Sequence, residues 1–122
     1  MEDDDLRDLF SGLGRVSIRR MFGGKGIYFE GRIVALDLVD EVVLKADAVS
    51  APLFAAEGCR QWSYEGKSGA VAMPYWSIPD SALDDPDEMA RWARTAYEAA
   101  LRAPEKQKRA AKRPSRSQAA TA

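Results

Sequence analysis

Three glycines within four positions separate two β-prone runs near the start of the chain. The first run ends in Met21-Phe22, the glycines follow, and Ile27-Tyr28-Phe29 begins the second run at once. Glycine adopts positive φ at little cost and lets two backbone segments approach without a Cβ between them. A cluster of it between strand-like runs predicts a tight turn or bulge, with the two runs paired on either side. Residues 16–44 are therefore expected to form an antiparallel meander that needs helices to bury one face.

The last helix has the strongest signals. Asp85 can cap its first turn, Pro86 suits the first helical position, and Glu88 can reach back to complete a capping box. Apolar residues then recur at every third or fourth position for more than three turns, and Pro104 ends the pattern. A long amphipathic helix is therefore expected between Asp85 and Pro104.

Shorter patterns predict the remaining helices. Apolar residues at helical spacing between Leu6 and Leu13 indicate a first helix over about residues 3–12. Ser50 can cap a short helix that Gly58 ends. Leu53, Phe54 and Ala56 are expected to face the sheet. The expected fold is a two-layer α+β unit in α-β4-α-β2-α order, with helices packed on an antiparallel sheet of about six strands. The expected strands are 16–22, 27–29, 33–39, 42–44, 61–65 and 70–76.

Charge divides the chain into two regions. From Met1 to Leu101 it carries 11 basic and 18 acidic residues, a net charge of −7, whereas from Arg102 onward it carries seven basic residues and one acidic residue, a net charge of +6. The 122 residues fit one domain. We expect that domain over residues 1–103, followed by a basic, disordered tail over 104–122, because the tail has no aliphatic side chain larger than alanine to bury.

Two absences from the sequence narrow its chemistry. The chain has no histidine, and Cys59 is its one cysteine. Zinc sites built from Cys and His, nucleophile pairs with histidine and imidazole proton shuttles all lack their parts. We therefore predict no catalytic residues, no metal site and no cofactor, and expect Cys59 to be an inert, partly buried thiol. An acidic N-terminus and the lack of a run of ~20 apolar residues favour a cytoplasmic protein.

Two weaker signals point to small-molecule chemistry. Gly66-Lys67-Ser68 is similar to the end of a phosphate-binding P-loop, but Gln61 stands where that motif has its first glycine, and the segment links two strands. A hairpin turn is expected there instead. Buried carboxylates such as Asp37 or Glu65 would serve an enzyme only in a deep pocket that perturbs their pKa values. A binding module is the favoured class.

Basic and aromatic side chains supply the candidate interaction surface. Basic residues cluster around the glycine turn, where anion or nucleic-acid contact competes with an ordinary solvated strand face. Lys25 and Lys67 are both expected to be exposed on glycine-rich turns. Tyr75 and Trp76 are adjacent on one strand and must point to opposite faces, and the aromatic residues of the last two strands suit the core, a homodimer interface or base stacking. The candidate interaction residues are Arg19, Arg20, Gly23, Gly24, Lys25, Lys67, Tyr75 and Trp76.

The tail is the strongest electrostatic feature of the sequence. Its cations suit weak, salt-sensitive and sequence-independent nucleic-acid binding. Contact with the acidic body and a simple contribution to solubility are the alternatives. The candidate nucleic-acid contacts in the tail are Lys106, Lys108, Arg109, Lys112, Arg113 and Arg116.

Six short blocks, spread over roughly Leu6 to Leu101, together resemble the N-terminal domain of the TfoX/Sxy family. The resemblance implies a secretion-chaperone-like α+β architecture, present here as a stand-alone domain, with no catalytic activity. The blocks are Met21-Phe22-Gly23-Gly24-x-Gly26-Ile27-Tyr28, Leu44-Lys45, Trp62-x-Tyr64, Met73-x-Tyr75-Trp76, Ile78-Pro79 and Trp92-Ala93.

For function, the resemblance implies regulation. Fuller members of the family are positive regulators of natural competence that assist a cyclic-AMP-responsive transcription factor at certain promoters. Those members carry a second, helical C-terminal domain where this chain has its basic tail. We therefore expect a non-enzymatic regulatory or adaptor protein that acts through protein–protein contacts, with a transcription factor and a second copy of the chain as the expected partners. Weak nucleic-acid binding led by the tail is the alternative.

Overall fold

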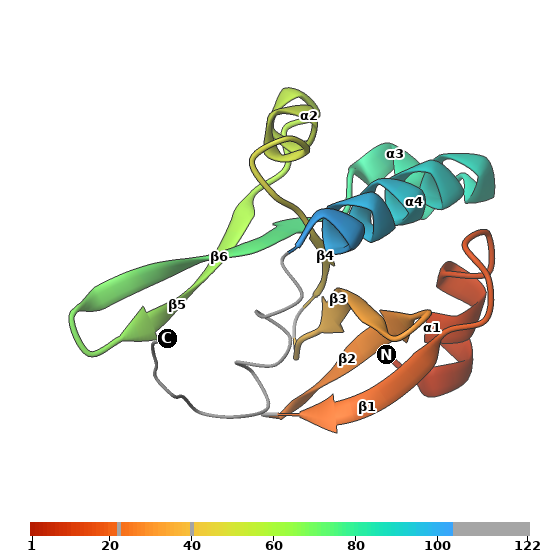
Figure 1. Cartoon of the computed structure of the whole chain (residues 1–122), viewed down its shortest axis with the longest axis horizontal. Helices are drawn as coiled ribbons and strands as arrows, with labels where there is room; N and C mark the ends of the chain where they lie inside the picture. Colours follow the sequence, from red (N-terminus) through yellow and green to blue (C-terminus); the bar gives the residue numbers. More distant parts are fainter. Residues whose placement is uncertain (22, 40, 104–122) are drawn as a thin grey trace.

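An open antiparallel sheet with helices on one face forms the body of the protein (Figure 1). The computed structural model describes residues 1–21, 23–39 and 41–103. Within these ranges six strands lie in the order β1-β2-β3-β4-β6-β5, which confirms the expected α+β fold and its strand count. The strands are β1 (Ser17–Met21), β2 (Gly24–Phe29), β3 (Arg32–Asp37), β4 (Val42–Lys45), β5 (Gln61–Gly66) and β6 (Gly69–Ser77).

Four helices accompany the sheet in the described part of the chain. The order expected from the sequence is confirmed, with one addition, since a helix of four residues precedes the long C-terminal one. A segment this short carries no helical periodicity that could have predicted it. The helices are α1 (Asp3–Leu9), α2 (Ala51–Ala56), α3 (Asp80–Leu83) and α4 (Pro86–Arg102).

The main core lies between the helices and the sheet. α4 runs across the sheet with α3 beside it (Figure 1). Phe54 of α2 is fully buried, and its ring centroid lies 4.8 Å from that of Trp92 in α4 and 6.3 Å from that of Trp76 in β6. At the other end of the core, Phe29 of β2 meets Tyr97 of α4 edge to face at 4.9 Å. These aromatic contacts join α2, α4 and the sheet into one packed unit.

The start of α4 follows the sequence prediction in most respects. The Oδ1 atom of Asp85 accepts hydrogen bonds from the backbone N–H groups of Asp87 (3.0 Å) and Glu88 (3.4 Å), and Pro86 occupies the first turn. The predicted capping box is wrong in one detail, because the Glu88 carboxylate is engaged by Arg91 at 3.0 Å. The Asp85 carboxylate therefore satisfies two of the first backbone donors of α4 without help from Glu88.

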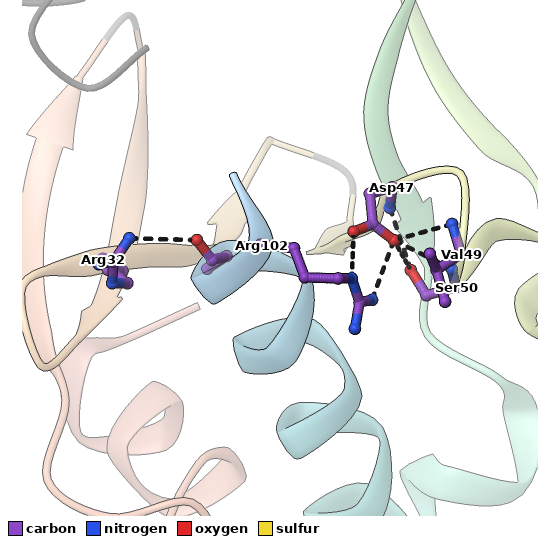
Figure 2. Close-up of polar contacts among 6 residues, drawn as sticks. Arg32, Asp47, Val49, Ser50 and Arg102 are labelled. Atoms are coloured by element: carbon purple, nitrogen blue, oxygen red, sulfur yellow. Dashed lines mark hydrogen bonds and ion pairs between the residues drawn. The ribbon is translucent and has the colours of Figure 1, made fainter. Parts of the chain in front are cut away.

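The end of α4 is held from two sides (Figure 2). Nη1 of Arg32, at the start of β3, donates a hydrogen bond to the carbonyl oxygen of Ala100 at 3.3 Å. The guanidinium of Arg102 donates to both carboxylate oxygens of Asp47, from Nε at 2.7 Å and from Nη2 at 3.0 Å. Two-pronged pairing of this kind fixes orientation as well as distance. The last turn of α4 is thereby attached to β3 and to the loop between β4 and α2.

Asp47 also organises the loop that leads into α2. Its Oδ1 atom accepts hydrogen bonds from the backbone N–H groups of Val49 (3.1 Å) and Ser50 (3.0 Å). The Ser50 hydroxyl accepts a hydrogen bond from the Asp47 N–H at 3.0 Å and lies 3.2 Å from Asp47 Oδ1. The Ser50 hydroxyl is therefore hydrogen-bonded to Asp47 and makes no capping hydrogen bond to α2, so the predicted side-chain cap is wrong.

We expect the Asp47→Asn variant to be less stable than the wild type near pH 7 by up to about 1 kcal/mol, because the amide keeps an oxygen for the loop N–H groups but loses the charge pairing with Arg102. The hydrogen bond from Arg102 is the main cause that holds the pKa of Asp47 below its usual range. Because the folded state lowers this pKa, the carboxylate stabilises the fold above the unfolded pKa of about 3.9 and loses that effect as the pH falls through and below it. Urea unfolding near pH 7 and pH 3 should thus show the difference shrinking in acid. Asp84→Asn, at an exposed position, is the matched control, and a difference that persists unchanged in acid would contradict the assignment.

The β5–β6 hairpin confirms the turn expected at Lys67-Ser68. Gly66 pairs with Gly69 across that turn, so the segment is not a phosphate-binding loop. Farther from the turn the pairing is irregular, because Gln61 pairs with Trp76 while Ser63 already pairs with Ala72. Extra residues on one strand bend and twist a ribbon. From this bend onward the hairpin extends away from the helices (Figure 1), and most of its residues are exposed.

Candidate interaction surface

The glycine cluster lies at the end of the sheet where β1 leads into β2. Gly23 has φ +78° and is the turn residue that the sequence predicts. Gly24 and Gly26 lie within β2 instead, where they pair with Met21 and Arg19 of β1. The turn is therefore shorter than expected, and β2 begins three residues before the predicted strand.

Close approach explains why two glycines lie inside a strand. A Cβ added to Gly24 would lie 2.5 Å from the carbonyl oxygen of Asp37 in β3, which no real side chain tolerates. A Cβ on Gly26 would lie 2.9 Å from the end of Met21 and 3.1 Å from the Tyr28 ring. Gly24 thus lets β3 approach β2, whereas Gly26 lets two neighbouring side chains close over β2.

Lys25 lies on β2 and not on an exposed turn, so the predicted location is wrong. Its Nζ atom donates hydrogen bonds to Asp3 Oδ1 at 2.7 Å and to the carbonyl oxygen of Met1 at 2.9 Å, and its side chain is only 20 % exposed. The hydrogen bond from Lys25 is the main cause that lowers the pKa of Asp3. Lys25 therefore attaches α1 to the sheet, a contact that the linear sequence could not reveal.

Four predicted interaction residues line one hollow at this end of the sheet. Arg20, Gly23, Gly24 and Lys25 border a space of about 540 Å³. Asp37 also lines it, and its buried carboxylate lies 3.1 Å from the amino nitrogen of Met1. The structure therefore brings the glycine turn together with Arg20 and Lys25, although the Lys25 amine is already hydrogen-bonded to Asp3 of α1.

The opposite face of the sheet carries a second apolar cluster. Its members lie on strands except for Leu38, which directly follows β3, and none belongs to a described helix. We call this surface the helix-free face. It comprises the buried residues Leu36, Val43 and Tyr75 and the partly buried Met21, Ile33, Leu38, Trp62 and Met73, with Arg19, Tyr28 and Lys45 beside them.

Two cations lie over tyrosine rings on the helix-free face. The guanidinium carbon of Arg19 is 5.0 Å from the centroid of Tyr28, and Nζ of Lys45 is 5.4 Å from that of Tyr75. Both distances suit cation–π attraction. Burial raises the pKa of Tyr75 to about 12, with a smaller contribution from Tyr28, and burial also lowers the pKa of Lys45. This face therefore combines desolvated aromatic rings with positive charge.

Comparison with known families identifies the domain. Residues 8–100 match the family model of the TfoX N-terminal domain. The chain belongs to the TfoX family. No curated protein resembles the TfoX chain closely enough to be a match. The matched residues include every strand, so both the glycine turn and the helix-free face belong to the family domain.

The remaining predicted interaction residues of the TfoX domain are spread over different surfaces. Tyr75 and Trp76 point to opposite faces as expected, because Tyr75 belongs to the helix-free face while Trp76 packs on the main core. Lys67 is exposed at the tip of the β5–β6 hairpin, as predicted. Arg19 lies on the helix-free face, whereas Arg20 lines the hollow beside the turn.

The tail of the TfoX chain lies outside the described residues. The candidate contacts from Lys106 to Arg116 and the domain boundary after residue 103 therefore stay predictions. No helix in the described ranges is both long and apolar enough to cross a membrane.

The carboxylates considered for an enzymatic role in the TfoX domain do not lie together. Asp37 is buried as expected, but Glu65 is exposed, and β4 and β6 separate its strand from β3. Cys59 is partly buried as predicted, and burial raises the pKa of its thiol. In the part of the chain that the structure describes, no three His, Cys, Asp or Glu side chains gather as a metal-ligand set.

Sequence reasoning missed several residues of the helix-free face, including Met21, Leu36 and Val43. The available signal was the nearly continuous apolar run of β3 and β4, which indicates strands buried on both faces. That signal identifies the strands but not which side chains meet on the second face.

Proposed function

We propose that this TfoX domain is a non-enzymatic adaptor that binds a protein partner through its helix-free face. The observation that carries the proposal is the second apolar cluster, built without any described helix residue. An antiparallel sheet with one solvated face ordinarily places polar residues there. Here that face presents leucine, isoleucine, methionine, tyrosine and tryptophan. Tyrosine, tryptophan and methionine are enriched in protein interfaces, which supports a partner that covers this surface.

The charge of the helix-free face indicates the chemistry of the partner. Arg19 and Lys45 lie beside its aromatic rings, so a complementary partner presents acidic groups. Family membership supplies the candidate, because fuller TfoX/Sxy proteins assist a cyclic-AMP-responsive transcription factor. We therefore propose such a transcription factor as the partner and regulation of transcription as the role.

Charge reversal at Arg19 tests this proposal. We expect Arg19→Glu to weaken binding of the purified transcription factor by roughly tenfold or more, because a like charge then faces its acidic groups. Isothermal titration calorimetry measures the affinity. Arg94→Glu makes the same charge change on the exposed side of α4 and should leave the affinity within about twofold.

Three outcomes would contradict the adaptor proposal. The wild-type chain could fail to bind, or both reversals could weaken binding equally, which would indicate a nonspecific charge effect. A chain truncated after Ala103 that loses all binding would instead assign the function to the basic tail. Far-UV circular dichroism on each variant verifies that the fold is retained.

A further inference from the structure

The two edges of the sheet are protected to different degrees. β1 forms one edge and carries the adjacent Arg19 and Arg20, whose side chains point to opposite faces. β5 forms the other edge, and Glu65 is its only charged residue. Natural sheets prevent edge-to-edge pairing with charges, proline or bulges on the edge strand. β1 thus follows that pattern on both faces. β5 has no proline, and the irregular pairing near Gln61 puts the extra residues on β6, since two steps along β5 match four along β6, so the edge of β5 stays open to strand addition.

Apolar surface accompanies the open edge. Tyr64 on β5 is 46 % exposed, and Val71, its partner on β6, is 38 % exposed. The ring of Trp62 lies 6.2 Å from that of Tyr64 on the same side of the strand. A two-stranded ribbon that extends into water is only marginally stable on its own. The hairpin therefore offers a backbone edge and an aromatic side together.

We propose that β5 of one copy pairs antiparallel with β5 of a second copy, around a twofold axis at Ser63. The strand is self-complementary in this register. Trp62 lies opposite the partner's Tyr64, and Gln61 lies opposite the partner's Glu65, so rings meet rings and an amide meets a carboxylate. No like charges face each other, and aromatic cross-strand pairs stabilise antiparallel sheets. This complementarity favours a second copy over an unrelated peptide.

The expected contact is modest in size. Stable interfaces bury about 800 Å² on each partner, and one short strand with its neighbouring side chains is small by that standard. The dimer should therefore dissociate on dilution. Trp62 belongs to both the helix-free face and this contact. The two proposals can still fail separately, because their tests change different residues, Arg19 for the transcription factor and Ser63 for the dimer.

A charge swap at Ser63 tests both the pairing and its register. Ser63 is exposed, so lysine or glutamate fits there without entering the core. Directly opposed side chains in an antiparallel pair lie about 5 Å apart at their Cβ atoms. We expect the full wild-type chain to show a concentration-dependent dimer in sedimentation velocity, whereas Ser63→Lys and Ser63→Glu are each monomeric over the same range. An equimolar mixture of the two variants should recover the dimer, because lysine then faces glutamate.

Ser17→Lys is the matched control, because Ser17 is an exposed serine on the opposite edge strand. It should dimerise like the wild type. A wild-type chain that stays monomeric at every concentration would overturn the proposal, as would a dimer that survives both charged Ser63 variants. Failure of the mixture to dimerise would overturn the register centred on Ser63.

Discussion

Replacement of Phe54 by alanine is expected to lower the free energy of unfolding by about 3–5 kcal/mol. Phe54 is fully buried, and the structure, which describes all of α2, shows no other buried residue in that helix. Its ring packs between Trp92 of α4 and Trp76 of β6. The substitution leaves a cavity at the junction of three elements and removes the anchor of a helix of six residues. Urea unfolding followed by circular dichroism measures the loss.

The neighbouring residue provides the control for Phe54. Leu53 and Ala56 were expected to face the sheet, but both are exposed, Leu53 to 53 %, so the prediction is wrong for these two residues. A short amphipathic helix with one buried position gives too little pattern to distinguish them from Phe54. We expect Leu53→Ala to change the free energy of unfolding by no more than about 0.5 kcal/mol. Similar losses at both positions would contradict the orientation of α2.

Gly24→Ala is expected to cost about 1–3 kcal/mol, the usual range for overpacking. The added Cβ would lie 2.5 Å from the carbonyl oxygen of Asp37 and 3.7 Å from the Cα of Leu38. Both are backbone atoms, so no side-chain rotation relieves the contact, and β2 and β3 must separate locally. Thermal or urea unfolding measures the cost, and faster exchange of the backbone amides in β2 and β3 should accompany it.

Gly23→Asn separates this steric requirement from the conformational one. Gly23 has positive φ, but nothing lies within 4 Å of a Cβ built there. Asparagine adopts this backbone region more readily than other side chains, so we expect a smaller loss than at Gly24. A larger loss at Gly23 would indicate that the cluster serves the turn alone, as the sequence first suggests.

Local signals explain why so much of the fold could be predicted. Some features depend only on residues that are near one another in the sequence. Examples are the Asp85 cap, the turn at Lys67-Ser68 and the apolar face of α4. Lys25 shows where such reasoning fails, because its location depends on α1, whose Asp3 lies 22 positions earlier in the chain. The same holds for Gly24, whose need for glycine arises from a carbonyl on β3.

The candidate surface was predictable only in part. Adjacent Tyr75 and Trp76 had to point to opposite faces, and they do. Whether the second face is covered by a helix, another copy or a partner depends on topology, which residue type does not encode. The continuous apolar runs of β3 and β4 indicated that both faces of these strands are buried, but not which part of the molecule or which partner covers each face.

The difference between the two edges of the sheet also decides whether association stops at a dimer or continues into a fibre. If both edges were adhesive, β5 of each molecule could join β1 of the next, a head-to-tail contact that repeats without closing and yields fibres. The adjacent arginines of β1 place a positive charge on each face of that edge and so terminate growth. Loss of these two charges would therefore threaten solubility before it threatened the fold.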